Sequence, residues 1–282
     1  MSRFPAPDGT SLAFTEVGTG PRLLCVPGGP GRASAYLEDL GGLTDERTLV
    51  LLDGRATGAS EVPADPSSLR FDRLAGDVDA LRQHLGEDRV DLLGHSAGAL
   101  VAQAYAAAHP QRLRSLLLVT PSDHLQGGTR ADVPGIRAAR SCEPWYAEAA
   151  EAQEALADAA PAQQPSLVRA TRPFLYGRWD ERTQAHAASA DRQSSRRAEL
   201  GFGAGGEQVD VPGLLAALGR LDVPVLVVGA ERDAATGLAS VHAVAACFPS
   251  AQVEVVAGAG HFPWVDEPEV FRAVVAGFLS RV

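Results

Sequence analysis

A pentapeptide of the form Gly-x-Ser-x-Gly constrains this chain more than any other feature of its sequence. Gly94-His95-Ser96-Ala97-Gly98 follows an apolar run, and a helix rich in small residues is predicted from Ala97 onward. A serine on a sharp turn from strand to helix has a strained backbone, and small residues two positions away on either side let the strand and the helix approach each other. The pattern therefore predicts a projecting serine hydroxyl above a helix N-terminus, the geometry of a nucleophile.

Short apolar runs alternate with helix-like segments through the first 120 residues. Strands are predicted at 11–17, 22–26, 48–52, 90–93 and 115–119, and the last four are nearly continuous in apolar residues. Such runs are typical of strands that are covered on both faces of a parallel sheet. Amphipathic spacing predicts a helix over 71–85, and small residues predict another over 97–108. The alternation predicts a doubly wound, mostly parallel α/β sheet.

The pattern changes after residue 121. Residues 122–209 contain no apolar strand-like run, but they contain a helix-like stretch rich in alanine and glutamate over 145–159. Strand-like runs return at 223–228 and 253–256, and a terminal helix is predicted over 268–279. At 282 residues the chain suits one domain with an insertion. We therefore expect a core formed by 1–121 and 210–282, with 122–209 as a helical lid insertion over the C-terminal ends of the strands.

Composition and charge exclude several functions. The formal net charge of −10 disfavours nonspecific binding to nucleic acid or to an anionic membrane. The absence of lysine excludes a Schiff base with pyridoxal phosphate and the lysine of a phosphate-binding loop. Gly201 to Gly206 fit a dinucleotide pattern but follow no strand, so we interpret them as a loop. The three cysteines, Cys25, Cys142 and Cys247, are typical of free thiols. No metal or organic cofactor is expected.

The chain has neither a membrane-spanning run of about 18 apolar residues nor the apolar stretch of a secretory signal. We therefore expect a cytoplasmic location and no membrane partner. The oligomeric state is left open.

A serine nucleophile needs an imidazole base, and that base needs a carboxylate. In a sheet of this kind both follow the serine at strand ends, with the acid before the histidine. Asp233 follows the strand predicted at 223–228, and His261 follows the one at 253–256. We predict Ser96, Asp233 and His261 as the catalytic residues, with Glu231 as the competitor for the acid. His95 is expected to pack beneath the serine in a supporting role, and the other histidines are interpreted as surface or core residues.

When the serine attacks a carbonyl carbon, the carbonyl oxygen gains negative charge, which backbone amides can stabilise. One amide is that of Ala97, directly after the nucleophile. The second is expected from the glycine-rich loop after the strand at 22–26, and we choose Gly29. A purely structural turn is the alternative for this loop.

Together these residues resemble the α/β-hydrolase family, and most closely its proline iminopeptidase-like branch. The resemblance rests on PGGPG at 27–31, DGRATGAS at 53–60, GHSAGA at 94–99, GAERD at 229–233 and GAGHFPWVDEP at 258–268. It covers the core, and it implies the triad named above with an oxyanion loop at Gly28 and Gly29. The chain departs from the family at Pro27, where a histidine is usual, and at Asp53-Gly54-Arg55-Ala56, where Asp-Gln-Arg-Gly is usual. The lid carboxylates with which such peptidases hold a substrate amino terminus have no match here.

We therefore predict a serine hydrolase that cleaves an ester or amide bond of a small, apolar molecule or short peptide through an acyl-enzyme. Aromatic residues concentrate in the insertion, and three of them, Trp145, Tyr146 and Trp179, are expected to line an apolar pocket above the serine, with Trp264 contributing from the loop of His261. Packing of the insertion onto the core is the alternative role for them. Two other functions stay open: an esterase, lactonase or acyl-transferring enzyme without peptidase activity, and a noncatalytic ligand receptor.

Overall fold

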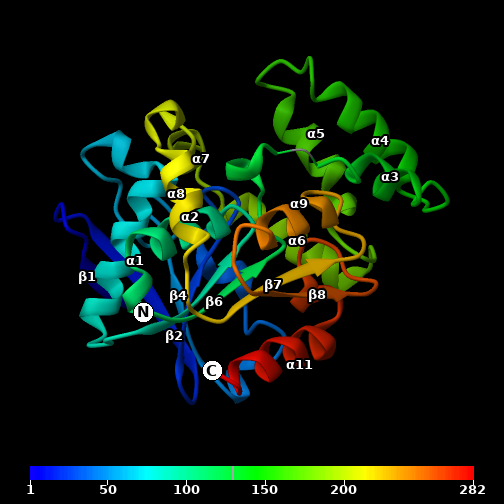
Figure 1. Ribbon diagram of the computed structural model, residues 1–282. Coiled ribbons are helices and arrows are strands. Elements are labelled where there is room, and N and C mark those ends of the chain that lie inside the picture. The colour runs from blue at the N-terminus through cyan, green and yellow to red at the C-terminus, as the bar shows by residue number, and fades with distance from the viewer. Residues whose placement is uncertain (129) are drawn as a thin grey trace.

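The computed structural model describes residues 1–128 and 130–282, and the centre of the described chain is an eight-stranded sheet (Figure 1). Its order is β1-β2-β4-β3-β5-β6-β7-β8, in which β1 and β2 are antiparallel to their neighbours and the other pairs are parallel. This confirms the predicted doubly wound, mostly parallel sheet. The strands are β1 (Ser2–Pro5), β2 (Ser11–Gly18), β3 (Arg22–Val26), β4 (Thr48–Leu52), β5 (Val90–His95), β6 (Leu113–Val119), β7 (Val225–Ala230) and β8 (Ala251–Val256).

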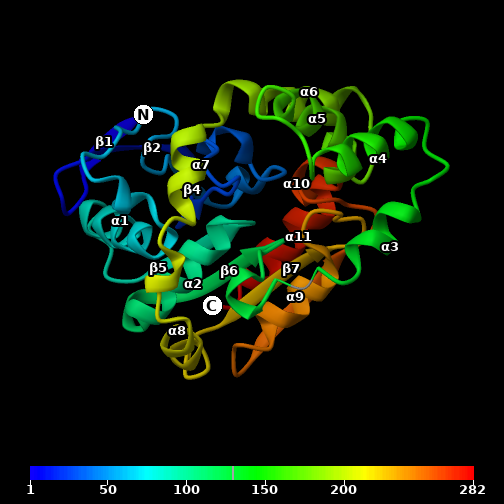
Figure 2. The same cartoon turned by 90° about the horizontal axis from the view of Figure 1, so that it is seen from above.

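Successive residues of a strand face opposite sides of the sheet. Leu92 on β5 belongs to a core that contains α1, α2, α8 and α9, whereas Leu93 belongs to a core that contains α11. Figure 1 shows α9 above β7 and α11 below it, and Figure 2 shows the same elements from above. Because both faces are covered, both sets of side chains must be apolar. These helices are α1 (Phe71–His84), α2 (Gly98–Ala108), α8 (Val211–Leu218), α9 (Gly237–Ala245) and α11 (Pro268–Leu279).

The core elements expected from the sequence are present, with bounds that shift by one or two residues. Strand β1 was not predicted. It is a short edge strand in which Phe4 is the one buried side chain. A strand with a single buried residue has no alternation of apolar and polar residues to detect.

Residues 122–209, the expected insertion, contain helices and, in their described part, no strand. Three of these helices, α3, α4 and α5, stand above one end of the sheet (Figure 1). The Leu175 carbonyl accepts a hydrogen bond of 2.8 Å from the His261 amide, so the insertion contacts the loop after β8. The helices are α3 (Val133–Ala138), α4 (Tyr146–Ala155), α5 (Gln164–Thr171), α6 (Glu181–Gln193) and α7 (Arg196–Phe202).

The glycine-rich stretch at 201–206 begins in the last turn of α7 and continues as turns. No strand precedes it, so it lacks the strand-to-helix context of a dinucleotide site. Among the described residues, no helix combines the length and apolar character needed to cross a bilayer.

Candidate active site

Ser96 lies on the turn between β5 and α2 and has a φ of 53°, in the left-handed region. Two close backbone contacts explain its flanking glycines. A Cβ on Gly94 would lie 2.7 Å from the Gly98 carbonyl oxygen, and a Cβ on Gly98 would lie 2.4 Å from the Val26 carbonyl oxygen. Both distances are too short for a side chain, so the tight turn requires glycine on each side of the serine.

The structure brings Ser96, His261 and Asp233 together in one continuous line of hydrogen bonds. His261 Nε2 lies 2.9 Å from Ser96 Oγ. Its other ring nitrogen, Nδ1, lies 3.0 Å from Asp233 Oδ2 and 3.1 Å from Oδ1. All three side chains are almost fully buried. This geometry lets a histidine accept the serine proton while a carboxylate stabilises the resulting imidazolium.

Asp233 is held as an ionised carboxylate. Burial alone would raise its pKa, but the neighbouring charge of His261 and hydrogen bonds from His261, Thr236 and Ala235 lower the pKa of Asp233 to about 2. The Thr236 hydroxyl donates to Oδ2 at 2.6 Å and the Ala235 amide to Oδ1 at 2.9 Å. Glu231, the competing candidate, is exposed and accepts from the Gly258 amide at 2.8 Å. The structure therefore places Asp233, and not Glu231, against the histidine.

The glycine loop after β3 borders the nucleophile. A Cβ on Gly28 would lie 2.9 Å from Ser96 Cβ and 3.2 Å from the Ala97 nitrogen. The Gly28 amide donates to Tyr36 Oη at 2.6 Å. Within the described residues, the amides of Gly29 and Ala97 donate no hydrogen bond. Ala97 also caps the N-terminus of α2, where the helix dipole is positive. Both amides expected to hold an oxyanion are thus without a partner among the described residues.

The aromatic residues expected at the substrate pack in two places. Trp145 and Tyr146 contact Phe174 edge-on, with ring centroids 5.2 and 5.9 Å away, and this cluster includes Ala234, which follows Asp233. Trp179 packs 5.6 Å from the Tyr176 ring. These contacts join the insertion to the core near the triad, and contact with substrate stays a prediction for them.

Trp264 differs from its expected position. It is 1% exposed, and its ring lies edge-on to His95 at 4.8 Å. A tryptophan in this core position supports the elbow from below and presents no surface to a substrate. The sequence reveals that it follows the catalytic histidine but not that its side chain points inward.

Sequence reasoning also missed several buried polar groups around the triad. Tyr36, Tyr176 and His186 are each at most 3% exposed, and hydrogen bonds join Tyr176 to His186, His186 to Tyr36 and Tyr36 to His95. Asp266 accepts hydrogen bonds of 2.9 Å from the amides of Gly177 and Gly260. No motif marks Tyr36, Tyr176 and His186, and the bonds from Tyr36 to His95 and from His186 to Tyr36 join segments distant in sequence. Asp266 lies within GAGHFPWVDEP, but that stretch does not reveal that its carboxylate accepts from backbone amides.

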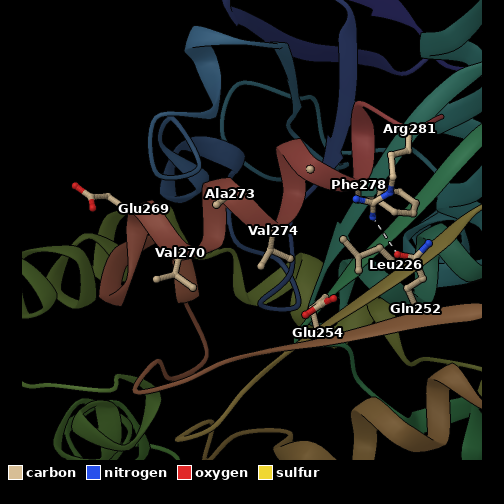
Figure 3. Close-up of a pocket in the computed structure, with 10 residues that line it drawn as sticks. Leu226, Gln252, Glu254, Glu269, Val270, Ala273, Val274, Phe278 and Arg281 are labelled. Atoms are coloured by element: carbon tan, nitrogen blue, oxygen red, sulfur yellow. Dashed lines mark hydrogen bonds between the residues drawn. The ribbon is translucent and has the colours of Figure 1, made fainter.

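A groove of about 540 Å³ lies away from the serine, between α11 and β8 (Figure 3). Its lining includes Leu226 and Gln252, which pair near the beginnings of β7 and β8, whereas the triad lies at strand ends. Arg281 donates to Gln252 at one end of it. None of the expected substrate residues lines this groove. In the described part of the chain, no group of three or more histidine, cysteine or acidic side chains could hold a metal ion.

Comparisons with known proteins agree with this geometry. Residues 21–268 match the model of the alpha/beta hydrolase fold family. A proline iminopeptidase of Heyndrickxia coagulans is 34% identical over 108 residues, which is 38% of this chain and 38% of that protein. A putative 2-succinyl-6-hydroxy-2,4-cyclohexadiene-1-carboxylate synthase of Bacillus subtilis is 25% identical and covers 98% of this chain and 97% of that one. An esterase from Exiguobacterium antarcticum superposes with a TM-score of 0.74 at 18% identity, over 99% of both chains.

Proposed function

This chain belongs to the alpha/beta hydrolase fold family, and from that premise we propose that it is a serine hydrolase acting on a carboxylic ester. Ser96 is the nucleophile, His261 the general base and Asp233 its carboxylate partner. One observation carries the proposal. His261 bonds Ser96 Oγ through one ring nitrogen and Asp233 through the other, at 2.9 and 3.0 Å. That arrangement activates an otherwise inert hydroxyl.

In the proposed reaction, His261 Nε2 takes the proton from Ser96 Oγ as that oxygen attacks the ester carbonyl carbon. The Gly29 and Ala97 amides bind the oxyanion that forms. The tetrahedral intermediate then collapses, the carbon–oxygen bond to the alcohol breaks, and His261 gives its proton to the leaving alcohol. A water deprotonated by the same imidazole attacks the acyl-enzyme and releases the acid. Asp233 stays ionised throughout.

An ester is favoured over a peptide by the glutamates of the insertion. A peptidase that removes a first residue needs a carboxylate to hold the substrate's amino group. Glu148, Glu151 and Glu154 on α4 are all exposed, and Glu143 pairs with Arg140 at 3.6 Å. None of these glutamates is buried near the triad as a free acceptor. The aromatic cluster around Phe174 instead supports a small, apolar acyl group as substrate.

An amide-cleaving aminopeptidase is the second candidate, because part of the chain is similar to a proline iminopeptidase. Acyl transfer to an acceptor other than water would use the same intermediate. A noncatalytic ligand receptor on this fold is the third candidate. Such a receptor would not need the aligned Ser96, His261 and Asp233.

The test compares hydrolysis of p-nitrophenyl esters, short and aromatic, with hydrolysis of proline p-nitroanilide, using Ser96→Ala as the blank. We expect ester cleavage that falls by about 10³-fold or more in Ser96→Ala. Preferred cleavage of the anilide would establish the aminopeptidase instead. Labelling by a fluorophosphonate probe adds a substrate-independent measurement, and a wild-type protein that neither reacts with the probe nor cleaves any substrate would be a receptor.

A further inference from the structure

Two tyrosine–histidine pairs lie in series beneath the candidate active site. Tyr176 Oη lies 2.7 Å from His186 Nδ1, and His186 Nε2 lies 2.9 Å from the Tyr36 carbonyl oxygen. Tyr36 Oη lies 2.7 Å from His95 Nδ1, and His95 Nε2 lies 2.9 Å from the His261 carbonyl oxygen. The series runs from the insertion, through the segment after the glycine loop, to the catalytic histidine.

The direction of each hydrogen bond follows from what each atom can donate. A carbonyl oxygen only accepts, so Nε2 carries the proton in both His186 and His95. The Tyr36 hydroxyl already accepts from the Gly28 amide at 2.6 Å, so its own hydrogen goes to His95 Nδ1. Tyr176 donates to His186 Nδ1 in the same way. Every proton in the series then has one acceptor, and both histidines are neutral.

The surroundings keep these histidines neutral. Burial, followed by the charge of His261, holds the pKa of His95 well below its usual value. Burial also lowers the pKa of His186 to about 4. The Arg32 guanidinium stacks on the Tyr36 ring at 4.3 Å and donates to the His186 carbonyl at 3.2 Å, so its positive charge opposes protonation of both rings.

The Phe262 ring packs against the whole series. It lies 4.9 Å from His186, 5.1 Å from Tyr176, 5.4 Å from His95 and 5.9 Å from Tyr36. Phe262 also follows His261 directly, and the two rings lie 5.3 Å apart. Its ring therefore fills the space between the members of the series. The side chains are therefore fixed by packing as well as by hydrogen bonds.

We propose that Tyr36 and His95 are positioning residues that fix the oxyanion loop and the catalytic base relative to each other, and that His186 and Tyr176 tie the insertion to this pair. The Tyr36 hydroxyl holds the Gly28 amide on one side of Ser96. Through His95 it holds the backbone of His261 on the other side. One hydroxyl thus sets the separation between the Gly29 amide and His261 Nε2. This inference rests on the proposed serine hydrolase.

The central test is Tyr36→Phe, which keeps the ring and removes the hydroxyl. Tyr105→Phe is the matched control, since Tyr105 is fully buried and its hydroxyl bonds Asp79 at 3.3 Å, away from the triad. We expect Tyr36→Phe to lower kcat by about 10- to 100-fold, because a small misplacement of reacting groups has an effect of that size. KM should change by less than about threefold, because ground-state binding is not removed. Tyr105→Phe should lower the unfolding midpoint and leave kcat unchanged.

A second measurement separates positioning from folding. The rate of fluorophosphonate labelling reports on Ser96 and His261, and its end point counts the folded sites. We expect the Tyr36→Phe protein to reach the full end point at a rate lowered by a similar factor. Combining Tyr36→Phe with His95→Gln should cost no more than the worse single change, because the two residues act as one unit.

The inference would be overturned if Tyr36→Phe and Tyr105→Phe had the same kcat per labelled site. Additive effects of Tyr36→Phe and His95→Gln would also overturn it. So would fluorophosphonate labelling of Tyr36→Phe that reaches a lowered end point at an unchanged rate. Should Tyr36→Phe not fold, Tyr176→Phe carries the test, with an expected loss of about threefold or more in kcat, and an unchanged kcat would contradict the inference. A wild-type protein that is not labelled would contradict the proposed function itself, a distinct outcome.

Discussion

The amide of His261 donates a hydrogen bond of 2.8 Å to the carbonyl of Leu175, so the proposed base and the insertion share a backbone contact. The contact is tight along the neighbouring residues. A Cβ on Gly260 would lie 2.6 Å from the Leu175 carbonyl oxygen, and one on Gly177 would lie 1.9 Å from the Gly258 carbonyl oxygen. The insertion therefore forms one wall of the turn that carries the base, as well as standing above the sheet.

This contact makes Gly177 sensitive to any side chain. We expect Gly177→Ala to push the insertion away from the histidine turn and to lower kcat/KM by about 10²-fold, an effect typical of misplaced catalytic groups. Gly203→Ala is the control, because a Cβ there meets no atom within 4 Å. Steady-state kinetics on the best ester from the substrate panel makes the comparison. Equal activity of the two variants would show that the close contact does not position His261.

The carboxylate assignment is tested by Asp233→Asn against Glu231→Gln. Asparagine cannot stabilise an imidazolium at His261, so we expect kcat to fall by about 10³- to 10⁴-fold in Asp233→Asn. Among the described groups, the Glu231 side chain bonds only the Gly258 amide, so Glu231→Gln should keep activity within about threefold of wild type. The reverse order of the two effects would move the role of the acid to Glu231.

Asp266 gives stability a defined dependence on pH. Burial raises the pKa of Asp266 from 3.8 to about 6, against the effect of hydrogen bonds from the Gly177, Gly260 and Arg178 amides. Between those values the folded protein keeps a proton that the unfolded chain has lost. Its contribution to stability is present below pH 3.8 and is lost as pH rises through 6. We expect Asp266→Asn, which stays neutral at every pH, to remove this pH dependence, so that the variant becomes more stable than wild type by on the order of 2 to 3 kcal/mol as pH rises through 6.

The measurement is the difference in unfolding free energy, from urea titration, between wild type and Asp266→Asn across about pH 4 to 7. The difference isolates Asp266, because the lowered pKa values of His95 and His186 affect the stability of both proteins equally and cancel. Asp233, whose pKa is lowered to about 2, loses its contribution only below its ordinary value of 3.8, outside this window. Parallel curves for the two proteins would show that Asp266 titrates normally.

Much of the core and the candidate triad could be predicted because the signals are local. Asp233 and His261 each follow an apolar run that predicts a strand, and Ser96 is marked by a glycine two residues before it and another two residues after it. The Tyr36–His95 and Tyr176–His186 pairs could not be predicted, since each joins segments that only the folded chain brings together. Trp264 shows the same limit. Its position after the histidine was evident, but whether its ring faces substrate or core depends on how α10 (Pro263–Asp266) turns, which the sequence does not specify.

Ala56 adopts a backbone conformation that its side chain disfavours. Its φ is 60°, in the left-handed region, and its amide donates to the Glu61 carbonyl at 2.9 Å. The resemblance to the hydrolase family places glycine at this position, and glycine adopts a positive φ without strain. Relief of that strain, about 1 to 2 kcal/mol, exceeds the extra entropy that glycine gives the unfolded chain. We therefore expect Ala56→Gly to raise the Tm by about 1 to 3 °C.

Gly58→Ala should act in the opposite direction, because its φ is 51° and a Cβ there would lie 2.0 Å from Asp53 Oδ2. Differential scanning calorimetry of the two variants makes the comparison, and a lowered Tm in Ala56→Gly would mean that residue 56 does not hold this left-handed conformation in solution.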